Sequence, residues 1–162
     1  MDTREKIVSR EGLATILDEH RRAGRKIAFA NGVFDLLHVG HVRYLAAARA
    51  EADVLVVGVN SDSSTRALKG PSRPLLTERA RAALVAALKS VDYVVIFDEL
   101  DVRPLLRQLH PDVHAKGSDY SADTVPERDI AELLGIRIAI VGDPKDHSTR
   151  DLLARLRTKS DG

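Results

Sequence analysis

Short apolar runs alternate with amphipathic stretches along most of this chain, and that alternation constrains the fold more than any other feature. The run Val54–Val57 is continuously apolar, as expected of a strand buried on both faces of a sheet. Stretches with helical spacing of apolar residues lie between such runs. Strands that alternate with helices form right-handed βαβ units, so the sequence predicts an α/β fold. We expect a doubly wound, parallel, five-stranded sheet with helices on both faces.

The expected elements follow from the same pattern. Strands are expected over residues 26–30, 53–59, 91–97, 112–115 and 136–141. Helices are expected over residues 9–24, 39–50, 61–68, 77–89, 101–109, 124–134 and 148–156. Because no repeat or linker divides the 162 residues, we expect a single domain over residues 1–162 with a frayed tail over 158–162.

Composition excludes several functional classes. Cysteine is absent, which excludes disulfide scaffolds, thiolate metal sites and cysteine nucleophiles. Lys and Arg number 25 against 24 Asp and Glu, with no charged tail, so we expect no nucleic-acid partner. No apolar run approaches the roughly 20 residues of a membrane span, and the N-terminus does not resemble a signal peptide. We therefore expect no membrane contact and a location in the cytoplasm.

The strongest motif follows the first expected strand, where the carboxyl ends of parallel strands bind ligands. It reads Gly-Val-Phe-Asp-Leu-Leu-His-Val-Gly-His over residues 32–41 and follows a predicted Asn-Gly turn. His38 and His41 would share one face in the first turn of a helix. A helix N-terminus attracts phosphate, and Gly40 lets a bulky anion approach the backbone. The loop lacks the glycine patterns of dinucleotide-binding dehydrogenases and P-loop NTPases.

Two other interpretations of the histidine pair stay open on the residues alone. The pair could bind zinc, with further ligands from carboxylates or from the other histidines, which are His20, His110, His114 and His147. Alternatively, His38 caps the helix or fills the core and has no catalytic role.

Three further loops carry cations or hydroxyl groups. Lys69 and Arg73 lie on an expected Gly/Pro loop that could fold over a phosphate, or they are simply solvated. Gly117 would allow a tight turn after a strand while Lys116 points at the same anion, or the segment is an ordinary surface turn. The expected helix at Ser148 begins with a capping-box pattern, whose hydroxyl and N–H groups also suit phosphate.

Residues 31–41, Asn-Gly-Val-Phe-Asp-Leu-Leu-His-Val-Gly-His, resemble the signature of the cytidylyltransferase-like nucleotidyltransferases, a Rossmann-like superfamily. Segments 59–62, 68–74, 91–95, 111–120 and 148–149 are similar to D-glycero-β-D-manno-heptose 1-phosphate adenylyltransferases. These occur alone or as the C-terminal half of a bifunctional heptokinase/adenylyltransferase. The resemblance covers about residues 9–157, and the Lys-Gly-Ser-Asp-Tyr block at 116–120 points to the heptose branch.

The resemblance implies that AMP passes from ATP to the heptose 1-phosphate by direct in-line attack, giving ADP-heptose and pyrophosphate. Implied catalytic residues are His38, His41, Lys69 and Lys116. Implied nucleotide-binding residues are Val33, Phe34, His38, Gly40, His41, Lys116, Gly117, Ser148 and Thr149. Implied substrate-binding residues are Asp35, Lys69, Arg73, Asp119 and Tyr120. Mg²⁺ is expected to enter through phosphates rather than protein ligands, and a homodimer is expected because dimers are common among such enzymes.

Three positions need separate interpretation. Arg150 replaces the last Thr of the family's Ser-Thr-Thr pattern, so only Ser148 and Thr149 carry over. Arg81 matches a family position, but a salt bridge on a helix surface would explain it. Asp35 is costly beside an anion unless it is paired, which favours a structural or sugar-binding role over catalysis.

Two other functions remain open from the sequence. One is a cytidylyltransferase acting on glycerol 3-phosphate or a similar polyol phosphate. The other is a non-catalytic nucleotide- or zinc-binding module.

Overall fold

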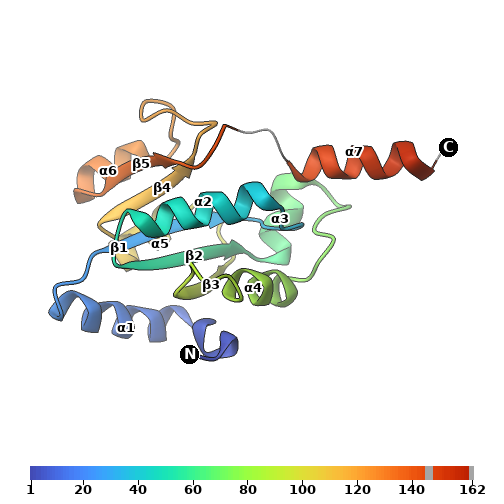
Figure 1. The fold of residues 1–162 in the computed structure, drawn as a ribbon. Helices are drawn as coiled ribbons and strands as arrows, with labels where there is room; N and C mark the ends of the chain where they lie inside the picture. Colours follow the sequence, from blue (N-terminus) through green and yellow to red (C-terminus); the bar gives the residue numbers. More distant parts are fainter. Residues whose placement is uncertain (145–147, 161–162) are drawn as a thin grey trace.

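The computed structural model describes residues 1–144 and 148–160 and contains one parallel sheet (Figure 1). Its strands are β1 (Ile27–Gly32), β2 (Val54–Asn60), β3 (Tyr93–Phe97), β4 (Val113–Gly117) and β5 (Arg137–Val141). They run in the order β3-β2-β1-β4-β5, so the direction of winding reverses between β1 and β4. The predicted α/β, doubly wound, five-stranded sheet is confirmed, and ligands of such sheets bind at this reversal.

Helices cover both faces of the sheet. They are η1 (Thr3–Lys6), α1 (Arg10–Arg22), α2 (Val39–Ala50), α3 (Asp62–Lys69), α4 (Glu78–Ala86), α5 (Arg103–Leu109), α6 (Arg128–Leu134) and α7 (Thr149–Ser160). One core joins α2 and α4 to the sheet, and a second joins α1, α5 and α6 to the opposite face. None of the helices in the described part of the chain has the length and apolar character needed to cross a membrane.

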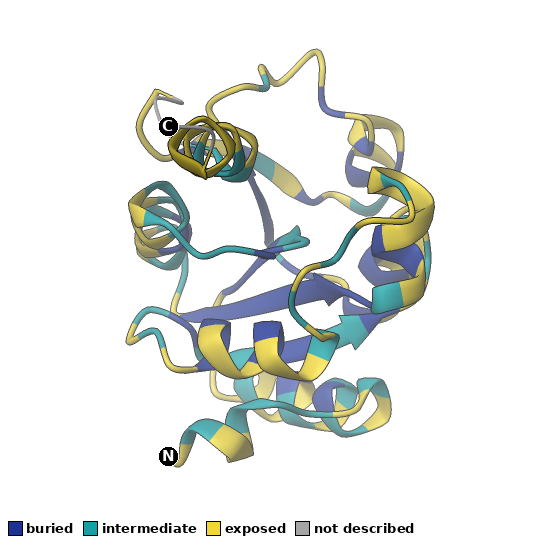
Figure 2. Cartoon of the chain, turned by 90° about the vertical axis from the view of Figure 1, so that its right-hand side faces the viewer, coloured by how far each residue is buried: buried dark blue, intermediate teal, exposed yellow. Residues whose placement is uncertain are grey.

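Side-chain alternation along β1 explains the two cores. Ala28 and Ala30 pack in the first core, whereas Ile27 and Phe29 pack in the second, because successive strand residues point to opposite faces. Figure 2 shows buried positions along the strands and on the inner faces of the helices, with exposed positions on the outer faces.

Several predicted boundaries are wrong. The predicted Asn31-Gly32 turn belongs to β1, where both residues pair with β2. Lys69 is the last residue of α3 and does not lie on the loop that follows. The sixth α-helix begins at Arg128 instead of residue 124.

The expected helix over 77–89 ends at Ala86, although the predicted N-cap is correct, since Thr77 Oγ1 accepts the N–H of Ala80 at 3.2 Å. The last helix continues through Ser160, so residues 158–160 are helical and not a frayed tail; residues 161–162 lie outside the described part.

Gly58 in β2 lies tightly packed between two aromatic rings. A Cβ atom there would lie 2.9 Å from Phe29 Cζ and 3.1 Å from Phe97 Cε1. Both rings are buried, so neither can move away without disturbing the second core. We expect Gly58→Ala to lower the free energy of unfolding by about 1–3 kcal/mol, as overpacked cores do. Urea unfolding would measure this, and a midpoint equal to wild type would contradict it.

Candidate active site

A cavity of about 640 Å³ opens at the carboxyl ends of the strands, over the reversal between β1 and β4. Its walls come from the loop after β1, the start of α2, the end of α3 and the loop after it, the loop after β4, residues 142–144 after β5, and α7. The predicted site residues that line it are Val33, Phe34, Asp35, His38, Gly40, His41, Lys69, Arg73, Lys116, Gly117, Asp119, Tyr120 and Thr149. The remaining one, Ser148, is not among the lining residues.

The cavity is rich in positive charge although the chain is nearly neutral. Its cationic residues are Arg43, Lys69, Arg73, Lys116, Arg150 and Arg157, and its carboxylates are Asp35, Asp119 and Asp143. The N-terminus of α2 adds N–H groups at the same place. A compact polyanion such as a triphosphate or a sugar phosphate suits this environment.

The imidazole rings of His38 and His41 stack on each other at the start of α2. Their ring centroids are 3.8 Å apart and their planes are 25° apart. His38 Nδ1 accepts the N–H of Gly40 at 3.1 Å, and His41 Nδ1 accepts the N–H of His38 at 3.4 Å. Because each Nδ1 is an acceptor, each neutral ring carries its hydrogen on Nε2. His38 therefore caps α2 through Nδ1, as the capping interpretation expected, and the cap bond leaves the ring hydrogen on Nε2.

Phe34 supports His41 from the core side. The Phe34 ring is buried, and its centroid lies 5.3 Å from that of His41 in an edge-to-face arrangement. Phe34 has a φ of 51°, in the left-handed region that side chains rarely adopt. Gly32 makes room for the ring, since a Cβ there would lie 3.1 Å from Phe34 Cε2.

Asp35 is fully engaged by the loop that precedes α4. Its carboxylate accepts the N–H groups of Leu75 and Leu76 at 2.9 Å and pairs with Arg73 Nε at 2.7 Å. These contacts support the structural alternative for Asp35 and assign Arg73 a role in holding this loop. Burial raises the pKa of Asp35, but the backbone N–H groups and Arg73 outweigh burial, so its pKa lies below the ordinary value.

The lowered pKa of Asp35 should make the free energy of unfolding depend on pH. A carboxyl whose native pKa is lowered stabilises the fold above its unfolded pKa of about 3.9, and this contribution disappears as pH falls through the native pKa. We expect Asp35→Asn to lower the free energy of unfolding by about 2 kcal/mol at pH 7. The difference from wild type should shrink below about pH 4. Urea unfolding at pH 7 and pH 3 tests this, and a gap independent of pH would contradict it.

Lys116 lies in β4, and its ammonium group contacts two side chains. Its Nζ lies 3.6 Å from Glu127 Oε2 and 4.7 Å from the centroid of the Tyr120 ring. Glu127 is buried and was missed, because no sequence pattern links it to Lys116. Gly117 is the last strand residue and opens the predicted tight turn, which the N–H of Tyr120 closes by donating to the Gly117 carbonyl oxygen at 3.1 Å. A Cβ at Gly117 would lie 2.9 Å from Asp119 Oδ1, so the glycine makes room for Asp119.

The start of α7 forms part of the wall of the same cavity. Ser148 Oγ accepts the N–H of Asp151 at 3.1 Å, which confirms the N-cap half of the predicted capping box. Thr149 and Arg150 both line the cavity, so the position that departs from the family's Ser-Thr-Thr pattern contributes a cation to the wall.

The structure places the Arg81 side chain differently from the prediction. Its side chain is completely buried, so the predicted surface salt bridge is wrong in its location. Its guanidinium donates to the carbonyl oxygens of Leu76 at 3.0 Å, Val33 at 2.8 Å and Asn60 at 2.7 Å, and it pairs with Asp62 at 2.9 Å. Arg81 therefore ties the loop after β1 to the end of β2.

Tyr44 was also missed. It lines the cavity from α2, and its hydroxyl donates to the carbonyl oxygen of Ala115 at 2.7 Å. Burial raises the pKa of this hydroxyl, which keeps it protonated. The helical period of residues 39–50 includes Tyr44, but nothing in the sequence indicates its partner.

The zinc interpretation gains no support from the described residues. Within residues 1–144 and 148–160, no three His, Asp or Glu side chains are arranged to hold a metal ion. His20 contacts the Tyr93 hydroxyl at 3.1 Å, His110 ends α5, and His114 is buried in β4. His147 lies outside the described residues.

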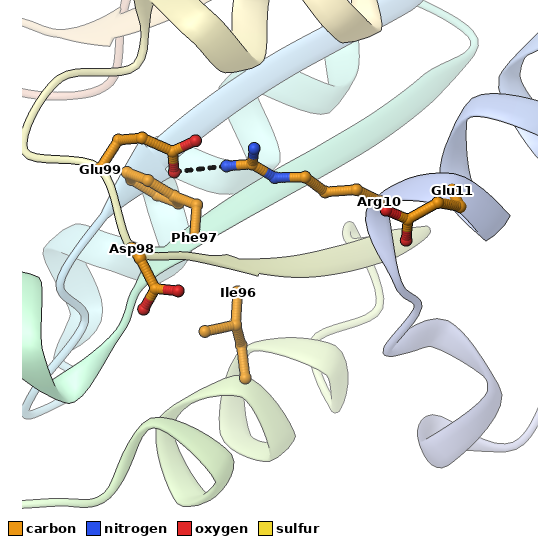
Figure 3. A pocket seen from close by; sticks show the side chains of 6 residues that line it. All are labelled: Arg10, Glu11, Ile96, Phe97, Asp98 and Glu99. Carbon is orange, nitrogen blue, oxygen red and sulfur yellow. Dashed lines mark hydrogen bonds and ion pairs between the residues drawn. The ribbon is translucent and has the colours of Figure 1, made fainter.

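A second, smaller cavity lies beside β3 and contains none of the predicted site residues. It measures about 320 Å³ and is lined by Arg10, Glu11, Ile96, Phe97, Asp98 and Glu99. Figure 3 shows Arg10 reaching across to form an ion pair with Glu99. Because the lining has one cation and three carboxylates, the cavity over β1 and β4 is the stronger candidate for an anion site.

Comparisons with known proteins agree with this site. The profile described as cytidylyltransferase-like matches residues 29–154. Bifunctional protein HldE of Syntrophotalea carbinolica is 48% identical over 151 residues, covering 93% of this chain and 31% of that protein. Bifunctional protein HldE of Acidiphilium cryptum is 48% identical over 153 residues, covering 94% and 32%. The chain thus spans about a third of the length of these curated relatives.

A solved structure is similar as well. The crystal structure of the lipopolysaccharide core biosynthesis protein from Thermoplasma volcanium aligns with a TM-score of 0.64 and 30% identity. The alignment covers 75% of this chain and all of that one.

Proposed function

This chain is a nucleotidyltransferase of the cytidylyltransferase-like family, and we propose that it transfers AMP from ATP to D-glycero-β-D-manno-heptose 1-phosphate. The observation that carries the proposal is the cationic cavity that the His38/His41 pair and the Lys-Gly-Ser-Asp-Tyr block of residues 116–120 line together. Similarity to two HldE proteins and to a lipopolysaccharide core biosynthesis protein supports the choice of a sugar phosphate.

The proposed reaction is a direct displacement at phosphorus. An oxygen of the sugar 1-phosphate attacks the α-phosphorus of ATP and forms the new O–P bond. The bond from the α-phosphorus to the bridging oxygen breaks, and pyrophosphate leaves with the electron pair. The attacking phosphate has a second pKa of about 6, so it is mostly ionised at neutral pH and needs no general base.

Catalysis in this proposal consists of positioning and charge stabilisation. The Nε2–H groups of His38 and His41 and the N-terminus of α2 would donate to phosphate oxygens as negative charge develops. Lys69 and Lys116 would offset the repulsion between the two anions. Mg²⁺ would enter as part of the MgATP substrate, held by its phosphates. The Asp35 carboxylate is already engaged by Arg73 and two backbone N–H groups, so it would not serve as a ligand.

A substrate matrix tests the proposal. The chain is incubated with ATP or CTP, each paired with the heptose 1-phosphate or with glycerol 3-phosphate, and pyrophosphate is measured. Release from ATP and the heptose 1-phosphate alone is expected. Release from CTP and glycerol 3-phosphate would favour the polyol-phosphate cytidylyltransferase, and no release from any pair would favour a binding module. Light scattering on the same samples tests the predicted homodimer.

A further inference from the structure

The sheet opens between β1 and β4 just below the cavity. Pairing of β1 with β4 ends at Phe29 and His114, whereas pairing of β1 with β2 continues to Gly32 and Val59. Asn31 lies two residues beyond the last β1–β4 pair, on the same face as Phe29, and it lines the cavity. The Asn31 side chain is therefore placed where the two strands separate and the ligand would sit.

His114 fixes one end of the Asn31 amide. The His114 side chain is fully buried, and its Nε2 lies 3.0 Å from Asn31 Oδ1. An amide oxygen only accepts hydrogen bonds, so Nε2 must carry the hydrogen. The other ring nitrogen, Nδ1, is buried without a hydrogen-bond partner in the described part of the protein. Burial lowers the pKa of His114 to about 3, which keeps the ring neutral at neutral pH.

The opposite end of the same amide faces outward. No hydrogen bond to Asn31 Nδ2 occurs among residues 1–144 and 148–160, and Nδ2 is not among the buried atoms that lack a partner there. It is therefore within reach of solvent at the cavity wall. Asn60, the other asparagine of the chain, differs because its Nδ2 donates to Ser64 Oγ at 3.3 Å and its side chain is buried.

Packing alone does not explain a histidine at position 114. Its ring centroid lies 5.6 Å from that of Phe29, in the second core, where an apolar ring would pack as well. An apolar ring would also remove the buried, unpartnered Nδ1 atom, which is costly to bury. What the histidine supplies and an apolar ring lacks is the donor that holds Asn31 Oδ1.

We propose that Asn31 contacts substrate through its Nδ2 hydrogens, and that His114 is the positioning residue that turns those hydrogens toward the cavity. The ligand atom is an acceptor oxygen of the nucleotide or of the sugar phosphate, so this inference rests on the proposed function. Asn31 then selects for an oxygen at the strand opening, and His114 acts only through Asn31.

Side-chain NMR tests the contact directly, because two asparagines and one glutamine give only three side-chain amide pairs. The protein is titrated with Mg²⁺ and α,β-methylene-ATP, and separately with the heptose 1-phosphate. One of these probes should shift the Asn31 pair, identifying which substrate supplies the oxygen. The internally bonded Asn60 pair should move less, and the exposed Gln108 pair of α5 serves as the reference.

The spectra separate failure of the contact from failure of the function. If the backbone amides of Gly40 and His41 respond and the Asn31 pair does not, the contact is refuted and the proposed function stands. If neither probe moves Gly40 or His41, no substrate enters the cavity, which overturns the proposed function and this inference together.

Three variants then test the positioning. Asn31→Asp has the same shape but replaces the donor with a negative charge, so the KM of the substrate identified by NMR should rise about tenfold or more. His114→Phe should raise the same KM several-fold, and His114→Gln, which keeps a donor, should restore it. A purely structural role predicts that His114→Phe lowers the melting temperature and leaves KM at the wild-type value, which would overturn the positioning role.

Discussion

Replacement of His41 with alanine is expected to lower kcat for pyrophosphate release by roughly two to three orders of magnitude, as loss of an oxyanion-type donor does. The His41 ring is stacked on His38 at 3.8 Å and supported by the Phe34 edge, so its Nε2–H is held in place before substrate arrives. A donor that is already oriented stabilises developing charge without reorganising. The rate under saturating ATP and sugar phosphate measures the effect.

Loss of activity must be separated from loss of structure. Alanine at position 41 also removes the ring contacts with His38 and Phe34, so urea unfolding of the variant is measured alongside kcat. Val42→Ala, at a neighbouring position that is 42% exposed, is the matched control and should keep wild-type kcat. A His41→Ala enzyme that turns over within threefold of wild type would remove His41 from the catalytic residues.

The sequence was sufficient to predict the sheet and the position of the His-x-Gly-His motif at the start of a helix, because both depend on local patterns. The continuous apolar run in β2 is typical of a doubly buried strand, and the structure buries every residue of β2. The His-x-Gly-His motif lies within four residues, so helical geometry alone places both rings at the start of α2. The extent of β1 was mispredicted because pairing with β2 overrides the turn preference of Asn31-Gly32.

Residues whose role depends on distant partners escaped prediction. Glu127 reaches Lys116 only through the packing of the segment before α6 against β4, which no spacing encodes.

The net charge of the chain likewise does not show where the charged side chains meet in the fold. A total of +1 led us to expect no extended polyanion as a partner, but it could not reveal that cations gather in one cavity.

Arg81→Met carries the second large effect, on stability. The substitution keeps most of the side-chain volume but removes donors from the carbonyl oxygens of Val33, Asn60 and Leu76 and leaves Asp62 without its guanidinium partner. Breaking such a buried network costs about 3–5 kcal/mol, a large share of the stability of a typical domain. For a chain of this length, the melting temperature should fall by about 10 °C.

Arg79→Met is the matched control, because Arg79 lies on the same helix but is exposed. It removes the same charge, so any effect of net charge on unfolding appears equally in both variants. An Arg81→Met protein whose urea midpoint equals that of Arg79→Met would show that the buried network adds nothing to stability.

Arg81→Met should also impair catalysis. Arg81 holds the carbonyl group of Val33, which precedes Phe34, the residue that supports His41. At a temperature where Arg81→Met remains folded, its kcat should therefore still fall below that of Arg79→Met.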